Sequence, residues 1–184
     1  MRALRLFNHA GPTSDDWYTP PWIFDGLGLT FDLDVASPPG GVPWIPAARF
    51  FDIDDNGLAQ EWSGLVWCNP PYSAPAQWCD KWALHPDGLI LIRADLSLRG
   101  PLAAFAAADA VHFTAGRLQF IDYEGNTRGA VTFSTVLLAR GERAVVGLER
   151  LEEKSGGCTR TLDRLPIRGK VVSQIMEEQW EQGS

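Results

Sequence analysis

The chain has 184 residues, of which 45% are hydrophobic and 21% are charged, which indicates a globular domain and excludes a disordered or fibrous chain. Its net charge of −7 excludes a protein that is basic overall, so any contact with nucleic acid must rest on a local group of basic residues. The sequence has neither a run of about 18 apolar residues nor an N-terminal signal-peptide pattern, so we expect a cytoplasmic protein.

The first predicted element is a helix that begins near Thr19. This residue is a suitable N-cap, and prolines such as those that follow it are tolerated in a first helical turn. The apolar residues Trp22, Ile23, Phe24 and Leu27 are then expected to face the core.

Short apolar segments farther along the chain predict buried strands. Continuous apolar runs of this length are typical of strands that are covered on both faces. Residues 76–84 and 101–108 predict helices between them, and residues 120–131 contain a turn sequence that predicts a hairpin and antiparallel last strands. The predicted strands are 30–36, 64–69, 88–93, 110–114 and 130–139.

This alternation of strands and helices predicts an α/β fold with a mixed, mostly parallel sheet and helices on both faces. We expect a single domain over residues 1–184, with a core of about residues 15–140. The C-terminal extension, about residues 141–184, is polar and mixed, and residues 171–182 within it are a candidate terminal helix.

The cysteine and histidine content predicts no metal site. The three cysteines form no CxxC pair, and their odd number disfavours a disulfide framework. The three histidines are scattered along the chain and lack the spacing of metal ligands.

The strongest motif is Asn69-Pro70-Pro71-Tyr72, which directly follows a predicted strand, where α/β sheets place their ligands. An exocyclic amine on a nucleobase or an amide is a poor nucleophile because its lone pair is delocalised. The Asn69 side-chain oxygen and the Pro70 carbonyl could accept its two N–H bonds and favour the pyramidal form, whose lone pair can attack. Tyr72 offers a ring on which a planar base can stack. The alternative is a proline-rich turn with an aromatic residue that covers the sheet edge.

The order of five motifs resembles the phage-type DNA N6-adenine methyltransferases. They are Asp15-Asp16-Trp17-Tyr18-Thr19-Pro20, Phe31-Asp32-Leu33-Asp34-Val35-Ala36, Asp55-Asn56-Gly57-Leu58, Asn69-Pro70-Pro71-Tyr72-Ser73 and Gly116-Arg117-Leu118-Gln119-Phe120. The resemblance implies a Rossmann-like methyltransferase fold, S-adenosylmethionine as the methyl donor and duplex DNA as the partner. It also implies a phage or prophage origin and action in the bacterial host cell.

The same resemblance assigns roles to individual residues. Thr19 and Pro20 would lie against the methionine end of the donor, and Asp34 or its neighbour Asp32 would pair with the ammonium or sulfonium side. Asp55 would accept a hydrogen bond from the amino group of the donor adenine. The alternatives are a solvated edge strand for the first two acids and a cap or turn role for Asp55.

Two further sets of residues complete the expected site. Asn69, Pro70, Pro71 and Tyr72 would form the catalytic loop. Many methyltransferases carry a glycine-rich loop after the first strand, whereas this chain reads Ala36-Ser37-Pro38-Pro39-Gly40-Gly41 there, so Ala36 is a candidate donor contact without GxG spacing.

Basic residues near the C-terminus are the candidate DNA contacts. Arg160, Arg164 and Arg168 lie with Lys170 in a stretch whose only acid is Asp163, and we interpret it as an arm that contacts phosphates. The alternative is a solvated surface segment. Arg117 is a further DNA-binding candidate, together with Arg93, Arg99 and Arg128 near the expected sheet edge.

Other functions stay open on the sequence alone. A methyltransferase for protein glutamine could use the same loop on a planar amide, and an N4-cytosine methyltransferase would act on a similar amine. A non-catalytic relative that keeps the fold and the donor pocket is the third alternative. Of the eight tryptophans, Trp17 and Trp44 are candidates for lining a pocket.

Overall fold

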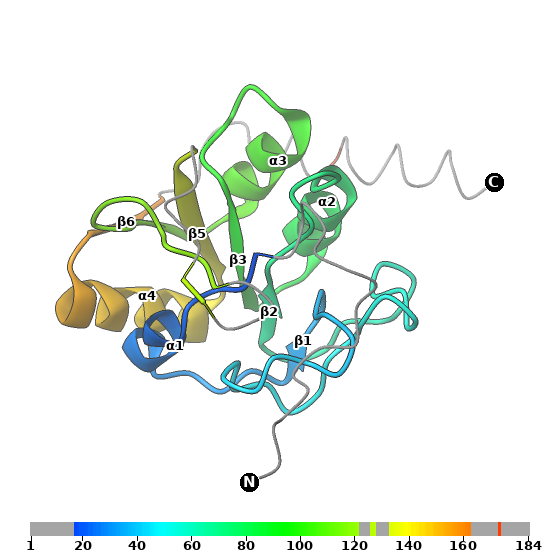
Figure 1. Cartoon of the computed structure of the whole chain (residues 1–184). Coiled ribbons are helices and arrows are strands. Elements are labelled where there is room, and N and C mark those ends of the chain that lie inside the picture. The colour runs from blue at the N-terminus through cyan, green and yellow to red at the C-terminus, as the bar shows by residue number, and fades with distance from the viewer. Residues whose placement is uncertain (1–16, 122–125, 128–132, 163–172, 174–184) are drawn as a thin grey trace, which may run out of the picture.

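A computed structural model describes residues 17–121, 126–127, 133–162 and 173. In this part of the chain, four helices and six strands form one mixed α/β arrangement (Figure 1). The helices are α1 (Pro21–Leu27), α2 (Ala76–Leu84), α3 (Arg99–Ala107) and α4 (Glu142–Ser155). The strands are β1 (Leu33–Asp34), β2 (Val66–Cys68), β3 (Gly88–Arg93), β4 (Ala110–Phe113), β5 (Thr135–Arg140) and β6 (Cys158–Thr161).

The sheet has the strand order β1-β2-β3-β5-β4-β6. The pairs β1–β2 and β2–β3 are parallel, whereas β3–β5, β4–β5 and β4–β6 are antiparallel. The prediction of a mostly parallel sheet is therefore wrong. The reason lies in β5, which lies between β3 and β4 and runs antiparallel to both. The prediction that the last strands are antiparallel is confirmed, although most of the predicted hairpin turn lies outside the described residues.

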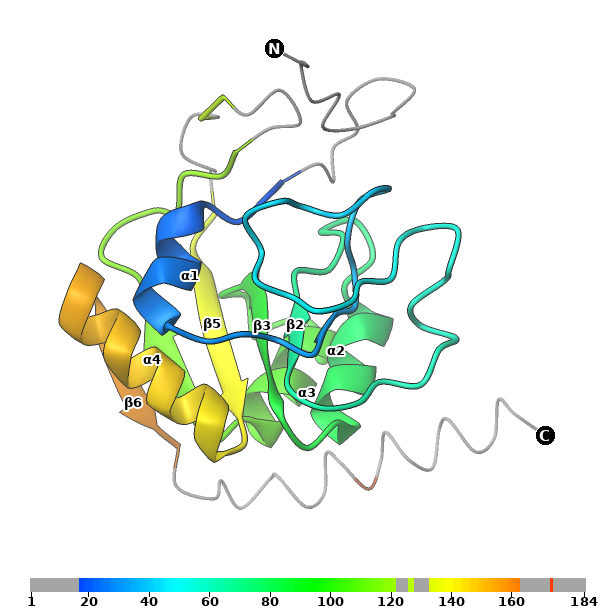
Figure 2. The same ribbon diagram turned by 90° about the horizontal axis from the view of Figure 1, so that it is seen from below.

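Helices cover both faces of the sheet, as predicted. In β3, Leu89 and Leu91 belong to the core beneath α1 and α4, whereas Ile90 and Ile92 belong to the core beneath α2 and α3. Figures 1 and 2 show the two helix pairs on opposite sides of the strands. Because successive side chains of a strand point to opposite faces, burial of both faces explains the continuous apolar runs.

The first strand is shorter than predicted, and its outer edge pairs with a loop. Residues 33–34 pair with β2, while the backbone N–H of Phe31, Asp34 and Ser37 donates to carbonyls of residues 46, 49 and 51. This loop covers the edge of the sheet. It also forms one side of the hollow at the carboxyl end of β1.

Both ends of the predicted fold need correction. Pro20 and not Thr19 is the N-cap of α1, and Trp22 is 42% exposed, although Ile23, Phe24 and Leu27 are buried as predicted. In the C-terminal extension, α4 buries one apolar face against α1, and β6 pairs with β4. These two elements therefore belong to the central sheet structure. The candidate helix at 171–182 lies outside the described residues apart from residue 173, and no helix within the described part is long and apolar enough to cross a membrane.

Candidate active site

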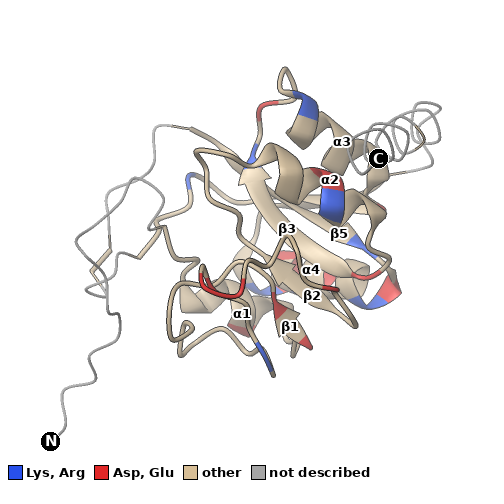
Figure 3. Ribbon diagram, turned by 90° about the vertical axis from the view of Figure 1, so that its right-hand side faces the viewer, with Lys and Arg blue, Asp and Glu red and all other residues tan. Residues whose placement is uncertain are grey.

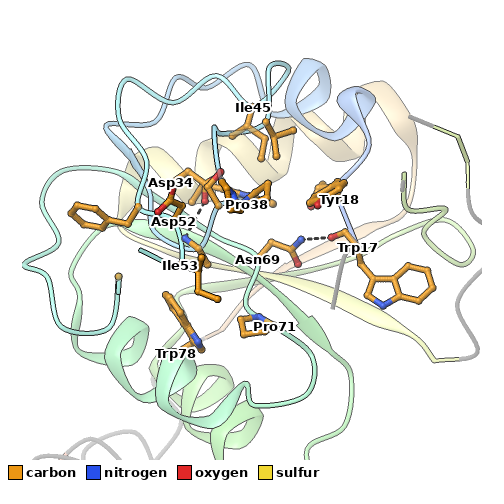
Figure 4. A pocket seen from close by; sticks show the side chains of 18 of the residues that line it. Trp17, Tyr18, Asp34, Pro38, Ile45, Asp52, Ile53, Asn69, Pro71 and Trp78 are labelled. Carbon is orange, nitrogen blue, oxygen red and sulfur yellow. Dashed lines mark hydrogen bonds between the residues drawn. The ribbon is translucent and has the colours of Figure 1, made fainter. Parts of the chain in front are cut away.

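The motif Asn69–Tyr72, called the catalytic loop below, follows β2 directly. Because β1 and β2 are parallel neighbours, with Asp34 opposite Trp67, the residues after both strands meet at one edge of the sheet. Figure 4 shows Asp34 and Asn69 at the same hollow from these two strand ends. The sequence prediction placed both side chains at this edge.

This hollow is a cavity of about 470 Å³, which is the size of a small-molecule site. Its wall combines the segment before α1, the end of β1, the loop that follows it, the end of β2 and one side of α2. The lining residues are Trp17, Tyr18, Thr19, Asp34, Ala36, Ser37, Pro38, Pro39, Val42, Ile45, Phe51, Asp52, Ile53, Asn56, Gly57, Trp67, Asn69, Pro71 and Trp78.

The amide of Asn69 has a fixed orientation. Its Nδ2 donates a hydrogen bond of 2.7 Å to the Trp17 carbonyl, as the dashed line in Figure 4 shows. Rotating the amide by 180° would place two oxygens against each other, so the bond determines which atom faces the cavity. Its Oδ1 is buried and accepts no hydrogen bond from any described residue. A buried acceptor without a donor is costly, so this oxygen is a ready partner for the N–H of a ligand.

Asp34 is a buried carboxyl at the cavity wall, 2% exposed. Burial raises its pKa from 3.8 to about 7, although the Ala36 N–H, at 3.3 Å from Oδ1, and the Ser37 side chain partly offset this effect. No described cationic side chain forms an ion pair with Asp34. A cationic ligand at this position would therefore favour the ionised form of the Asp34 carboxyl and would be attracted to it.

Thr19 and its neighbours close the side of the cavity next to α1. The Thr19 hydroxyl is buried and has no hydrogen-bond partner in the described part of the chain, whereas its carbonyl accepts a bond of 2.8 Å from Trp44 Nε1. Trp44 thus supports the cavity wall from behind without lining the cavity, whereas Trp17 lines it. Pro20 also lies behind the wall, at the start of α1.

Asp32 and Asp55, the other two candidate acids, lie outside the cavity. Asp32 precedes β1 at its amino end, where its Oδ2 accepts the Leu65 N–H at 2.7 Å and lies 3.8 Å from Arg143 Nη1. Asp55 uses its Oδ2 to accept the Asp52 N–H at 3.0 Å, which is the turn role that the sequence left as an alternative. Through its bond to Leu65, Asp32 links the amino ends of β1 and β2.

Residues 52–60, called the acidic loop below, also line the cavity through Asp52, Ile53 and Asn56, which the sequence did not identify as site residues. Their run of turn-forming residues was visible, but the sequence does not show which of them face inward. The Lys81 ammonium holds this loop from outside by donating to the carbonyls of Leu58, at 2.7 Å, Gly57, at 3.3 Å, and Gln60.

Tyr72 is packed into the core and does not line the cavity. Its ring is 7% exposed and lies 5.9 Å from the Phe120 ring and 5.3 Å from the Phe133 ring. In this arrangement the ring offers no free face for a base. Of the two prolines of the catalytic loop, Pro71 lines the cavity and Pro70 is buried beside it.

Two of the candidate DNA contacts that the structure describes, Arg117 and Arg160, are not among the residues that line the cavity. Arg160 is on β6, and the row from Cys68 to Arg160 crosses four strand spacings, or about 19 Å. Arg117 is exposed in the segment after β4, and Arg164, Arg168 and Arg128 lie outside the described residues. Figure 3 shows basic residues scattered among acidic ones on the face it presents.

Metal-ligating side chains do not cluster in the described part of the chain. No group of three or more His, Cys, Asp or Glu residues there could hold a metal ion. The three cysteines have free thiols.

Comparisons with known proteins identify the family. A search of curated proteins finds no match. The family model described as DNA N-6-adenine-methyltransferase (Dam) matches residues 8–147, a span that includes the whole cavity wall and the catalytic loop. The chain belongs to the DNA N-6-adenine-methyltransferase (Dam) family.

Proposed function

We propose that this protein transfers a methyl group from S-adenosylmethionine to the N6 amino group of adenine in duplex DNA. The observation that carries the proposal is Asn69 Oδ1, which is buried at the cavity wall with no donor among the described residues, while the Trp17 carbonyl fixes its amide. Membership of the Dam family supports the same reaction. The parallel strands β1 to β3, with the cavity at their carboxyl edge, support the expected Rossmann-like methyltransferase arrangement.

The residues of the cavity fit the donor. The Asp34 carboxyl suits a positive group, the orphaned Thr19 hydroxyl suits a polar group, and the Ala36 and Trp78 walls suit an apolar or aromatic part. When bound, S-adenosylmethionine supplies an electrophilic methyl group on a sulfonium. We infer that Asp34 balances the positive charge of the donor and that the surrounding apolar wall excludes water.

The catalytic loop would prepare the amine of the substrate. Asn69 Oδ1 accepts one N–H of the exocyclic amine, and the Pro70 carbonyl accepts the other. These two bonds draw the nitrogen toward the pyramidal form and strengthen as positive charge develops on it, which is the requirement for catalysis. Stacking of the base falls to Trp17, which lines the cavity, or to Tyr72 after a movement of its ring.

One assay tests the reaction and separates it from the alternatives. The protein is incubated with donor carrying a labelled methyl group and with either unmethylated duplex DNA or a cell lysate, and the products are digested and identified by mass. We expect N6-methyladenine from the wild type, and formation of this product slower by about a hundredfold or more in Asn69→Ala. Methylcytosine or methylglutamine as the labelled product would refute the adenine assignment, and donor binding without any transfer would indicate a non-catalytic relative. Phage origin and the cytoplasm of a host cell remain predictions of the resemblance.

A further inference from the structure

Arg93 ends β3 at the same edge of the sheet as the catalytic loop. Strands β2 and β3 are parallel neighbours, with Cys68 opposite Ile90, so the residues after Cys68 and those at the end of β3 come together. The lateral order β1-β2-β3 places the cavity on one side of the catalytic loop and Arg93 on the other. Arg93 is not among the residues that line the cavity.

The guanidinium of Arg93 is held by aromatic rings and not by acceptors. Its Cζ lies 4.0 Å from the centroid of the Phe133 ring and 5.6 Å from that of the Tyr72 ring. In such contacts a ring covers a face of the planar group, while the N–H donors point outward in its plane. Nε is buried without a partner, and no described residue accepts a hydrogen bond from Arg93 or forms a salt bridge with it.

A cation held in this way has a fixed position and unused donors. A half-buried guanidinium without acceptors is costly, and an anion that presents two oxygens, such as a phosphate, would satisfy it through paired hydrogen bonds. The protein carries a net charge of −7, so a site for a polyanion needs individual, well-placed cations such as this one.

We propose that Arg93 binds a backbone phosphate of the DNA beside the adenine that reaches Asn69. The inference rests on the proposed function and names a phosphate contact for it. The position of Arg93 beyond the catalytic loop favours the substrate over the carboxylate of the donor as the source of the anion. The phosphate contact would hold the strand while the base leaves the stack, and the stacked rings would keep the guanidinium in place.

The test compares duplex binding by the wild type and by Arg93→Gln, in the presence of S-adenosylhomocysteine, across a series of salt concentrations. We expect Arg93→Gln to weaken binding by about tenfold or more and to reduce the slope of log affinity against log salt by about one. The matched control is Arg150→Gln, which removes the same charge from α4 and should leave both quantities unchanged. Donor affinity and thermal unfolding of each variant are measured alongside.

Three results would overturn the inference in distinguishable ways. Wild-type affinity and slope in Arg93→Gln would refute the phosphate contact alone, since the wild type still binds DNA. Weaker donor binding in that variant would assign Arg93 to the donor. A wild-type protein that binds no duplex would refute the proposed function together with this inference.

A chemical change in the DNA keeps the test decisive if Arg93→Gln does not fold. Each phosphate that flanks the methylated adenine is replaced in turn by an uncharged methylphosphonate, and the wild-type protein is titrated. We expect one of the two replacements to weaken binding by about tenfold, and to have a smaller effect in Arg93→Lys, which keeps the charge but loses the paired donors. No loss from either replacement would overturn the inference.

Discussion

Replacement of Asp34 by Asn should remove a pH-dependent cost of folding. The carboxyl has a pKa of about 7 in the folded chain, against 3.8 for an aspartic acid in the unfolded chain, with burial as the main cause. At 1.36 kcal/mol per unit, this difference amounts to about 4 kcal/mol. Because the folded pKa is the higher one, the stabilisation by the protonated carboxyl is fully present below pH 3.8 and is lost as the pH rises toward 7.

Chemical denaturation at several pH values measures this effect. We expect the free energy of unfolding of Asp34→Asn to exceed that of the wild type by an amount that grows by about 4 kcal/mol between pH 4 and pH 8. Asp25→Asn, at an exposed position on α1, is measured alongside as the matched aspartate control. A difference between Asp34→Asn and the wild type that stays constant with pH would refute the assignment of a buried, protonated Asp34.

The pH dependence of donor binding should also depend on the Asp34 carboxyl. A cationic ligand requires the ionised carboxylate, so donor affinity of the wild type should rise by about tenfold per pH unit up to about pH 7 and then level off. Calorimetry in buffers of different ionisation enthalpy should detect a proton released on binding below that pH. Affinity that does not change between pH 5.5 and 7.5 would show that Asp34 does not face the positive part of the donor.

Four other substitutions, at three positions, probe the catalytic loop and the loop beside the cavity. Asn69→Ala should reduce methyl transfer by about a hundredfold or more while the donor dissociation constant from calorimetry stays near normal, and a large loss of donor affinity would contradict the role in the transition state. Tyr72→Ala should lower the free energy of unfolding by about 3–5 kcal/mol, whereas Tyr72→Phe, which loses a hydroxyl without a described partner, should fold as well as the wild type and retain much activity. Lys81→Met should weaken donor binding by about tenfold because it frees the acidic loop, and unchanged donor affinity would show that the loop holds its shape alone.

The sequence was a sound guide where a short pattern decides the outcome. The apolar run at 88–93 is β3 with the same bounds, and the segment 76–84 is α2. The prediction of helices on both faces of the sheet followed from continuous apolar strands, in which neither face is polar. The helix α4 could also have been found, because Ala144, Leu148 and Leu151 repeat at helical spacing.

The sequence was a poor guide to features that depend on contacts between segments far apart in the chain. The direction of β5 depends on which neighbours it meets, and Asp32 and Asp34 differ only in which end of a short strand each occupies. Asp32 has its partner at Leu65, and β1 has its edge covered by the loop at 46–51. Neither contact leaves a mark in the local pattern of residues.

The orientation of the Asn69 amide shows how a short motif depends on the fold around it. Its anchor is the carbonyl of Trp17, 52 residues earlier in the chain. The next residue, Tyr18, exchanges two backbone hydrogen bonds with Ile121, at 3.0 Å and 2.9 Å. These bonds fix the Trp17 carbonyl against the segment that joins β4 to β5. The four residues of the catalytic loop therefore supply the chemical groups, whereas the pairing of two distant segments determines which atom of Asn69 faces the cavity.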